Sequence, residues 1–88
     1  MTAKLESEWF VYIIRADDQS LYTGITTDLE RRLKQHQSGS GGAKFFRGRR
    51  AIEYVYTEAG HDRRSAAVRE AQIKKMSRQQ KLLLFSTS

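Results

Sequence analysis

The stretch that most constrains the fold is residues 9–36, which joins two apolar runs to a helical pattern. The first run, Trp9–Ile14 (WFVYII), is six consecutive apolar or aromatic residues, and the second is Leu21–Ile25 (LYTGI). Both are rich in β-branched and aromatic residues, so each predicts a strand, the first one covered on both faces. Asp17–Ser20 between them are turn-forming residues. Because this connection is short, we expect an antiparallel hairpin.

Alternation of side chains along the two strands brings two tyrosines to one face of the hairpin. With a three-residue loop at Ala16–Asp18, Tyr12 lies opposite Tyr22, whereas a longer loop with a shifted centre makes them diagonal neighbours. Either register keeps the two rings on one face, and only a two-residue turn separates them. Gly24 leaves space beside the rings for close approach of backbone or ligand.

A helical pattern follows and carries two polar residues on its apolar stripe. Thr27 and Glu30 have the spacing of a capping box, so we expect Thr27 as the N-cap of a helix that runs to about residue 37. At about 100° per residue, Arg32 and His36 fall on the same arc as the leucines at positions 29 and 33. These two polar side chains are therefore expected to face the sheet.

The rest of the first sixty residues predicts two flexible segments, a short helical turn and one more strand. Residues 1–7 are expected to be a loose terminus, and residues 38–42 (SGSGG) a flexible break. Phe45–Phe46 are expected in a short helical turn under the core. Residues 51–57 (AIEYVYT) alternate as in a third strand, which is expected to end at Gly60.

Two more capping signals predict two further helices. Asp62 can cap a helix that runs through residue 75, and Ser77 with Gln80 has capping-box spacing for a short last helix. The predicted order is β-β-α-(short α)-β-α-α. We expect one domain over residues 1–88, with a core at about 8–82, of α/β (α+β) class: a three-stranded antiparallel β-sheet flanked by helices.

Charge and composition indicate which classes of partner, metal site and cellular location are compatible with the chain. Residues 1–43 carry a net charge of −1 and residues 44–88 carry +7. This cationic half predicts a polyanionic partner such as nucleic acid; the alternative is a merely basic, soluble protein. The chain has no cysteine, which excludes disulfides and cysteine-based zinc sites. No apolar run is long enough for a membrane helix and no signal peptide is recognisable, so we expect a cytoplasmic protein.

The motif residues resemble those of the GIY-YIG nuclease superfamily, and most closely its small stand-alone bacterial, YhbQ-like type. Phe10-Val11-Tyr12 stands at the Gly-Ile-Tyr element and Tyr22-Thr23-Gly24 at the Tyr-Ile-Gly element. Arg32 lies eight positions past that glycine, and His36 one helical turn further on. Glu70 matches the glutamate of the helix after the third strand. The resemblance covers about residues 8–82.

This resemblance implies a site in which each residue type has a chemical role. Tyr12 or Tyr22 would act as general base or orient water, and the residues alone leave open which one. Arg32 would stabilise charge on a phosphate, and His36 would donate to phosphate, relay a proton or cap the helix. Glu70 would bind a single Mg²⁺ or Mn²⁺ ion.

Each residue also has a structural alternative. Taken singly, each tyrosine is more typical of a core residue, and only the same-face pair beside Gly24 favours a catalytic role. Arg32 can be a core-edge residue, and Glu70 can be half of an i,i+4 ion pair with Lys74. Contacts to a nucleic-acid backbone are expected from the basic residues Lys44, Arg47, Arg49, Arg50, Lys74 and Arg78.

The function expected from the resemblance is metal-dependent hydrolysis of phosphodiester bonds in DNA, in a repair context. Recognition is expected to depend on branched or damaged structure rather than on a fixed sequence, because no second recognition domain is present. RNA stays open as a substrate. The alternatives are a non-catalytic nucleic-acid-binding module and an accessory protein of a repair complex, both with the same fold.

Overall fold

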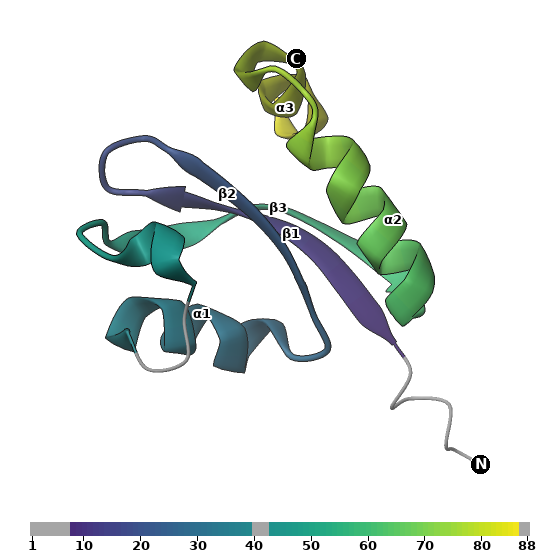
Figure 1. Ribbon diagram of the computed structural model, residues 1–88, viewed down its shortest axis with the longest axis horizontal. Helices are drawn as coiled ribbons and strands as arrows, with labels where there is room; N and C mark the ends of the chain where they lie inside the picture. Colours follow the sequence, from purple (N-terminus) through teal and green to yellow (C-terminus); the bar gives the residue numbers. More distant parts are fainter. Residues whose placement is uncertain (1–7, 40–42, 87–88) are drawn as a thin grey trace.

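The protein folds into a three-stranded antiparallel sheet with helices on both faces (Figure 1). The computed structural model describes residues 8–39 and 43–86. Its strands are β1 (Trp9–Ala16), β2 (Leu21–Thr26) and β3 (Ala51–His61), in the order β2-β1-β3 across the sheet. Its helices are α1 (Leu29–Ser38), the 3₁₀ helix η2 (Lys44–Phe46), α2 (Arg63–Lys74) and α3 (Arg78–Phe85). The predicted element order and fold class are confirmed.

Two segments whose structure was predicted from the sequence lie partly or wholly outside the residues that the structure describes. The expected loose terminus, residues 1–7, lies outside the described residues, as do residues 40–42 of the expected flexible break. The two residues of that break that are described, Ser38 and Gly39, end α1, and Gly39 takes the left-handed conformation with φ 80°.

The hairpin register makes the two tyrosines diagonal neighbours. Tyr12 pairs with Gly24, and Ile14 pairs with Tyr22. The Gln19 N–H donates to the Ala16 carbonyl over 2.9 Å, the Ala16 N–H donates to Ser20 over 2.8 Å, and Gln19 has φ 73°. The loop is therefore centred one residue later than the Ala16–Asp18 alternative, which accounts for the diagonal register.

The two faces of β1 are both buried, as the sequence predicted. Residues 11–14 are all 0 % exposed. Tyr12 and Ile14 pack with Phe46 on the face that α1 and η2 cover. Val11 and Ile13 pack with α2 and α3 on the opposite face. The central strand thus separates two small apolar clusters, and side chains on successive positions belong to different clusters.

The start of α1 differs from the prediction by one residue. Asp28, not Thr27, is the N-cap, and its carboxylate accepts the Arg31 N–H over 3.0 Å. A carboxylate at this position satisfies a free N–H and also interacts favourably with the positive end of the helix dipole, so it outcompetes the neighbouring hydroxyl. Glu30 consequently lies in the first turn, where its carboxylate is 4.0 Å from Lys34.

The third strand is longer and less regular than predicted. Gly60 does not end it: this residue takes φ 83° and the strand continues to His61, which pairs with Trp9. Ile13 pairs with Tyr56 but Ile14 pairs with Tyr54, so β3 contains a bulge. Because of this extra residue, the expected strict alternation fails, and Tyr54 and Tyr56 pack into different apolar clusters.

The last two helices begin where the capping signals predicted. Asp62 and Ser65 form a reciprocal capping box at α2, and Ser77 and Gln80 form one at α3. Within residues 8–39 and 43–86, no helix has the length and apolar character needed to cross a bilayer.

Candidate active site

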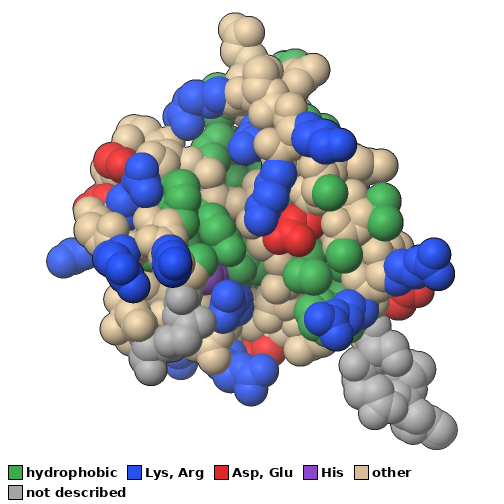
Figure 2. All heavy atoms as spheres, viewed as in Figure 1, with side chains coloured by type: hydrophobic (Ala, Val, Ile, Leu, Met, Phe, Trp, Pro, Cys, Tyr) green, Lys and Arg blue, Asp and Glu red, His purple; other side chains and the backbone are tan. Residues whose placement is uncertain are grey.

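The residues singled out from the sequence gather along β2, at the edge of the sheet. Tyr12 and Tyr22 come from the hairpin, and Arg32 and His36 come from α1 on one face. Glu70 comes from α2, which packs along β2 and β1 on the other face. Figure 2 shows this side of the molecule, where an acidic group lies among Lys and Arg side chains.

A buried hydrogen bond joins β1 to α1 at the centre of this region. The Tyr12 hydroxyl lies 2.9 Å from His36 Nε2, and the two residues are 0 % and 2 % exposed. The Ala43 N–H donates to His36 Nδ1 over 3.3 Å, so that nitrogen carries no proton. A neutral His36 must then hold its proton on Nε2 and donate it to the Tyr12 oxygen. The Tyr12 O–H proton remains available for a further acceptor.

Burial fixes the protonation state of this pair. Desolvation raises the pKa of Tyr12 to about 12, although hydrogen bonding to Arg32 opposes the shift. Desolvation, and then the positive charge of Arg32, lower the pKa of His36 to about 4. Both groups are therefore neutral at pH 7, because the cost of charging a buried group exceeds the benefit of its hydrogen bonds.

Gly24 is needed for the position of the Tyr12 ring. A Cβ at residue 24 would lie 2.6 Å from Tyr12 Cζ and nearer still to the hydroxyl oxygen. Real Cβ atoms do not approach other atoms that closely. The space that the sequence predicted beside Gly24 is thus filled by the Tyr12 hydroxyl, which lies across the backbone of β2.

Tyr22 differs from Tyr12 in its access to solvent. Its side chain is only half-buried, and its ring centroid lies 6.3 Å from that of Tyr12. The rings of His36, Phe45 and Phe46 surround it at centroid distances of 5.3, 5.2 and 5.2 Å. This aromatic packing holds the Tyr22 ring at the edge of the site, where a ligand can reach it.

Arg32 lies on the inward stripe of α1, as predicted. Its side chain is half-buried, and one guanidinium nitrogen donates to Gln35 over 2.9 Å. It also contributes to the pKa values of Tyr12 and His36, so the guanidinium borders their hydrogen bond. A planar guanidinium with several donors suits an anionic ligand at this edge.

Glu70 brings a carboxylate to the site from the opposite face. Its side chain is 23 % exposed, and its Oε2 lies 3.2 Å from Lys74 Nζ. Among residues 8–39 and 43–86, no three or more His, Cys, Asp or Glu side chains form a group that could hold a metal. A metal here would rest on Glu70 with water and substrate, and this single-carboxylate donor set fits Mg²⁺, which retains several of its waters.

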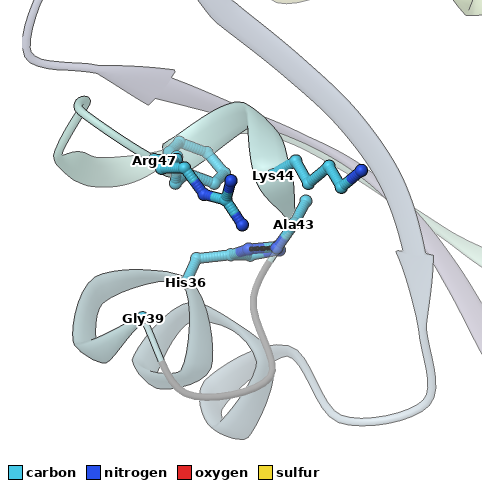
Figure 3. A pocket seen from close by; sticks show the side chains of 6 residues that line it. His36, Gly39, Ala43, Lys44 and Arg47 are labelled. Carbon is cyan, nitrogen blue, oxygen red and sulfur yellow. Dashed lines mark hydrogen bonds between the residues drawn. The ribbon is translucent and has the colours of Figure 1, made fainter.

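The six basic residues expected to bind nucleic acid have different surroundings. All six are exposed. Lys44 and Arg47 line a pocket of about 190 Å³ on the Nδ1 side of His36, where Arg47 points toward the imidazole (Figure 3). Lys74 is the last residue of α2, and Arg78 is the first of α3. The remaining two, Arg49 and Arg50, follow η2.

Arg49 is already engaged within the protein. Its Nε lies 2.9 Å from Asp18, it donates to the Phe45 carbonyl over 3.0 Å, and its guanidinium stacks 4.3 Å from the Phe45 ring centroid. Hydrogen bonds from Ser20 and then Arg49 lower the pKa of Asp18 to about 2. Arg49 thereby fastens the hairpin loop to η2.

The sequence reasoning missed the contribution of Tyr54. Its ring packs edge-on against Tyr12 at 5.2 Å, and its hydroxyl donates to the Leu29 carbonyl over 2.6 Å. Burial raises its pKa well above the ordinary value. The aromatic residue at alternate positions of the third strand was a signal, but the bulge concealed which tyrosine faced the site.

The chain is similar to known bacterial proteins over most of its length. The family described as the GIY-YIG catalytic domain matches residues 8–82. UPF0213 protein DP2720 of Desulfotalea psychrophila is 45 % identical over 80 residues, covering 91 % of this chain and 73 % of that protein. UPF0213 protein YhbQ of Escherichia coli is 48 % identical over 73 residues, covering 83 % and 72 %.

A solved structure of another UPF0213 protein is also similar to this chain. The solution NMR structure of UPF0213 protein BH0048 from Bacillus halodurans superimposes with a TM-score of 0.55 at 43 % identity, covering 88 % of this chain and 81 % of that one. The family match suggests a nuclease that acts on nucleic acid. The chain therefore belongs to the GIY-YIG catalytic domain family, among the small bacterial UPF0213 (YhbQ-like) proteins.

Proposed function

We propose that this protein is a divalent-metal-dependent endonuclease that hydrolyses phosphodiester bonds in DNA. We further propose that it selects branched or damaged structure rather than a fixed sequence. The observation that carries the proposal is the convergence at the β2 edge of an accessible tyrosine, an arginine and a carboxylate from three elements. The buried Tyr12–His36 hydrogen bond supports this arrangement, because it joins β1 to α1 and so fixes the helix that carries Arg32.

We assign the contact with the attacking water to Tyr22 rather than to Tyr12. The Tyr12 side chain is 0 % exposed and its pKa is about 12, so it neither meets water nor loses its proton near pH 7. Tyr22 is half-buried, and its ring is held by three aromatic neighbours. A rigid phenol at the edge of the sheet can orient water for attack on phosphorus.

Tyr12 and His36 serve in this proposal as positioning residues. The Ala43 N–H donates to Nδ1, which leaves the imidazole proton on Nε2. The Nε2–H group then donates a hydrogen bond to the Tyr12 oxygen. The pair ties α1 to β1 and so holds Arg32 at a fixed place beside the site. Arg32 is then the group that forks onto the scissile phosphate and stabilises its developing charge.

Glu70 is the residue that would hold the metal ion. A divalent cation bound to it would polarise the phosphate and stabilise the leaving 3′ oxygen. Lys44, Arg47, Lys74 and Arg78 would contact neighbouring phosphates, which positions the nucleic acid without reading its sequence.

The test compares cleavage by four proteins on several substrates. Native protein, Glu70→Ala, Arg32→Ala and the control Arg31→Ala are incubated with supercoiled, linear, single-stranded, branched and abasic DNA and with RNA, with and without Mg²⁺ or Mn²⁺. Arg31 is an exposed neighbour on the same helix, so its variant removes an equal charge outside the site.

We expect metal-dependent cutting by the native protein and Arg31→Ala, and a loss of at least about 100-fold in the two site variants. Absence of cutting on every substrate would overturn the nuclease proposal. If all four proteins nonetheless bind DNA with a steep salt dependence, the non-catalytic binding module takes its place. Cutting by Glu70→Ala at the native rate would show that the metal ligand is misassigned.

A further inference from the structure

The proposed metal ligand already has a cation beside it. Lys74 Nζ lies 3.2 Å from Glu70 Oε2, one helical turn along α2. The same ammonium lies 5.8 Å from the centroid of the Tyr22 ring, over its face. Lys74 therefore stands between the carboxylate expected to bind metal and the tyrosine expected to meet the substrate.

A lysine in this place opposes metal binding. Two cations that share one carboxylate repel each other, and the described residues offer no cluster of other acidic or imidazole groups to offset that repulsion. Half of the Lys74 side chain is exposed, so the ammonium can leave Glu70 at little cost. In this same position the ammonium already lies over the face of the Tyr22 ring, so a cation–π contact favours that side of the site when the ammonium leaves Glu70.

We propose that Lys74 is the internal counter-ion of Glu70 and competes with the metal for this carboxylate. When the metal binds, Lys74 turns from Glu70 toward the Tyr22 side of the site and becomes a ligand for a substrate phosphate. This inference rests on the proposed function, since it takes Glu70 as the metal ligand and the β2 edge as the place of the phosphate.

The exchange has a thermodynamic consequence. In the metal-free protein Lys74 is engaged by Glu70 and contributes little to DNA binding. Metal binding releases its charge, so metal and DNA each strengthen the binding of the other. This coupling is reciprocal, and Lys74 is the element that carries it.

The first experiment measures metal affinity without catalysis. Mn²⁺ binding is followed by electron paramagnetic resonance for the native protein, Lys74→Gln, Lys74→Arg, Lys75→Gln and Glu70→Gln, each checked for folding by circular dichroism. Lys75 is the next residue along the chain and is also exposed, so its variant removes the same charge from a nearby position.

We expect Lys74→Gln to bind Mn²⁺ about three- to tenfold more tightly than the native protein, because it lacks the competing charge. Lys74→Arg should stay near the native affinity, Lys75→Gln should change it less than twofold, and Glu70→Gln should lose the site. The second experiment measures binding of a fluorescent branched DNA by anisotropy, with and without Ca²⁺. Ca²⁺ should strengthen DNA binding by the native protein several-fold more than by Lys74→Gln.

The outcomes separate this inference from the proposed function. Equal Mn²⁺ affinity in Lys74→Gln, Lys75→Gln and the native protein, with loss in Glu70→Gln, overturns the competition and leaves Glu70 as the metal ligand. Equal strengthening of DNA binding by Ca²⁺ in native and Lys74→Gln overturns the release of Lys74 to phosphate. Mn²⁺ binding that survives Glu70→Gln overturns both the inference and the metal site of the proposed function.

Discussion

Acidification should destabilise this protein through one buried histidine. The His36 side chain is 2 % exposed, its Nε2–H donates a hydrogen bond to the Tyr12 oxygen, and its Nδ1 accepts one from the Ala43 N–H. Adding a proton would place a charge in the apolar cluster beside Arg32 and would break the bond from Ala43. The folded protein therefore resists protonation that the unfolded chain accepts readily.

The size of the effect follows from the two pKa values. The imidazole has an ordinary pKa of 6.5, and in the folded protein its pKa is about 4. Below pH 6.5 the unfolded chain binds a proton that the folded chain refuses until about pH 4, so stability falls as the pH is lowered through this window. A difference of about 2.5 pKa units corresponds to about 3 kcal/mol. For a domain stabilised by roughly 5–10 kcal/mol in total, that is a large share.

Urea unfolding at intervals between pH 7 and pH 4 measures this loss. The native protein is compared with His36→Gln, which keeps an N–H donor but does not titrate. The free-energy difference between the two should be constant above pH 6.5 and should shift by about 3 kcal/mol against the native protein by pH 4. The other histidine supplies a control, because His61→Gln retains His36 and should show the native loss.

Titration of the histidine ring protons by NMR tests the cause directly. The His36 signal should move with a midpoint near pH 4 while the protein stays folded. A midpoint near 6.5, or parallel pH curves for the native protein and His36→Gln, would refute the argument that burial and Arg32 keep this imidazole neutral.

Three further tests, two of them with a matched control variant, address other parts of the structure. Gly24→Ala should lower the free energy of unfolding by about 2 kcal/mol or more and abolish cleavage, because the new Cβ would overlap the Tyr12 side chain. Its control is Gly48→Ala, at φ 88°, where a Cβ would meet no atom of the described residues within 4 Å; this variant should lower the free energy of unfolding by about 1 kcal/mol and keep its activity. Both variants are measured by urea unfolding and DNA cleavage. Thr23→Val should raise stability by about 1 kcal/mol in the same unfolding assay, because the buried Thr23 hydroxyl has no hydrogen-bond partner among the described residues. In DNA binding at several salt concentrations, Arg47→Gln should reduce the slope of log K against log salt by about 1, and Arg49→Gln by clearly less, since its charge is already paired.

Much of the site's assembly followed from periodicity. Strand alternation predicted that Tyr12 and Tyr22 share a face, and the helical repeat predicted that Arg32 and His36 face the sheet. The structure confirms both arrangements. The i,i+4 pair of Glu70 with Lys74 was also expected, and it is present. These features depend on the spacing of residues within one helix or one hairpin, which can be counted along the sequence.

Other features depended on contacts between distant parts of the chain. The bulge in β3 is set by its pairing with β1, so the sequence of β3 alone could not show that Tyr54 and Tyr56 face opposite ways. The pairing of Arg49 with Asp18 joins residues 31 positions apart. The choice of Asp28 over Thr27 as N-cap is a small energetic difference between two suitable neighbours. The chemical roles of the site residues stay predictions.

The position of β2 has a consequence for handling the protein. This strand is at the edge of the sheet, so one side of its backbone has no partner strand among the described residues and can pair with another chain. Lysine near such an edge discourages pairing, and Lys74 lies over Tyr22 of this strand. Lys74, which would contact nucleic acid in the proposed function, would therefore also oppose the pairing of β2 with another chain. Variants that neutralise it should be checked by light scattering, because self-association would cover the site and resemble a loss of binding.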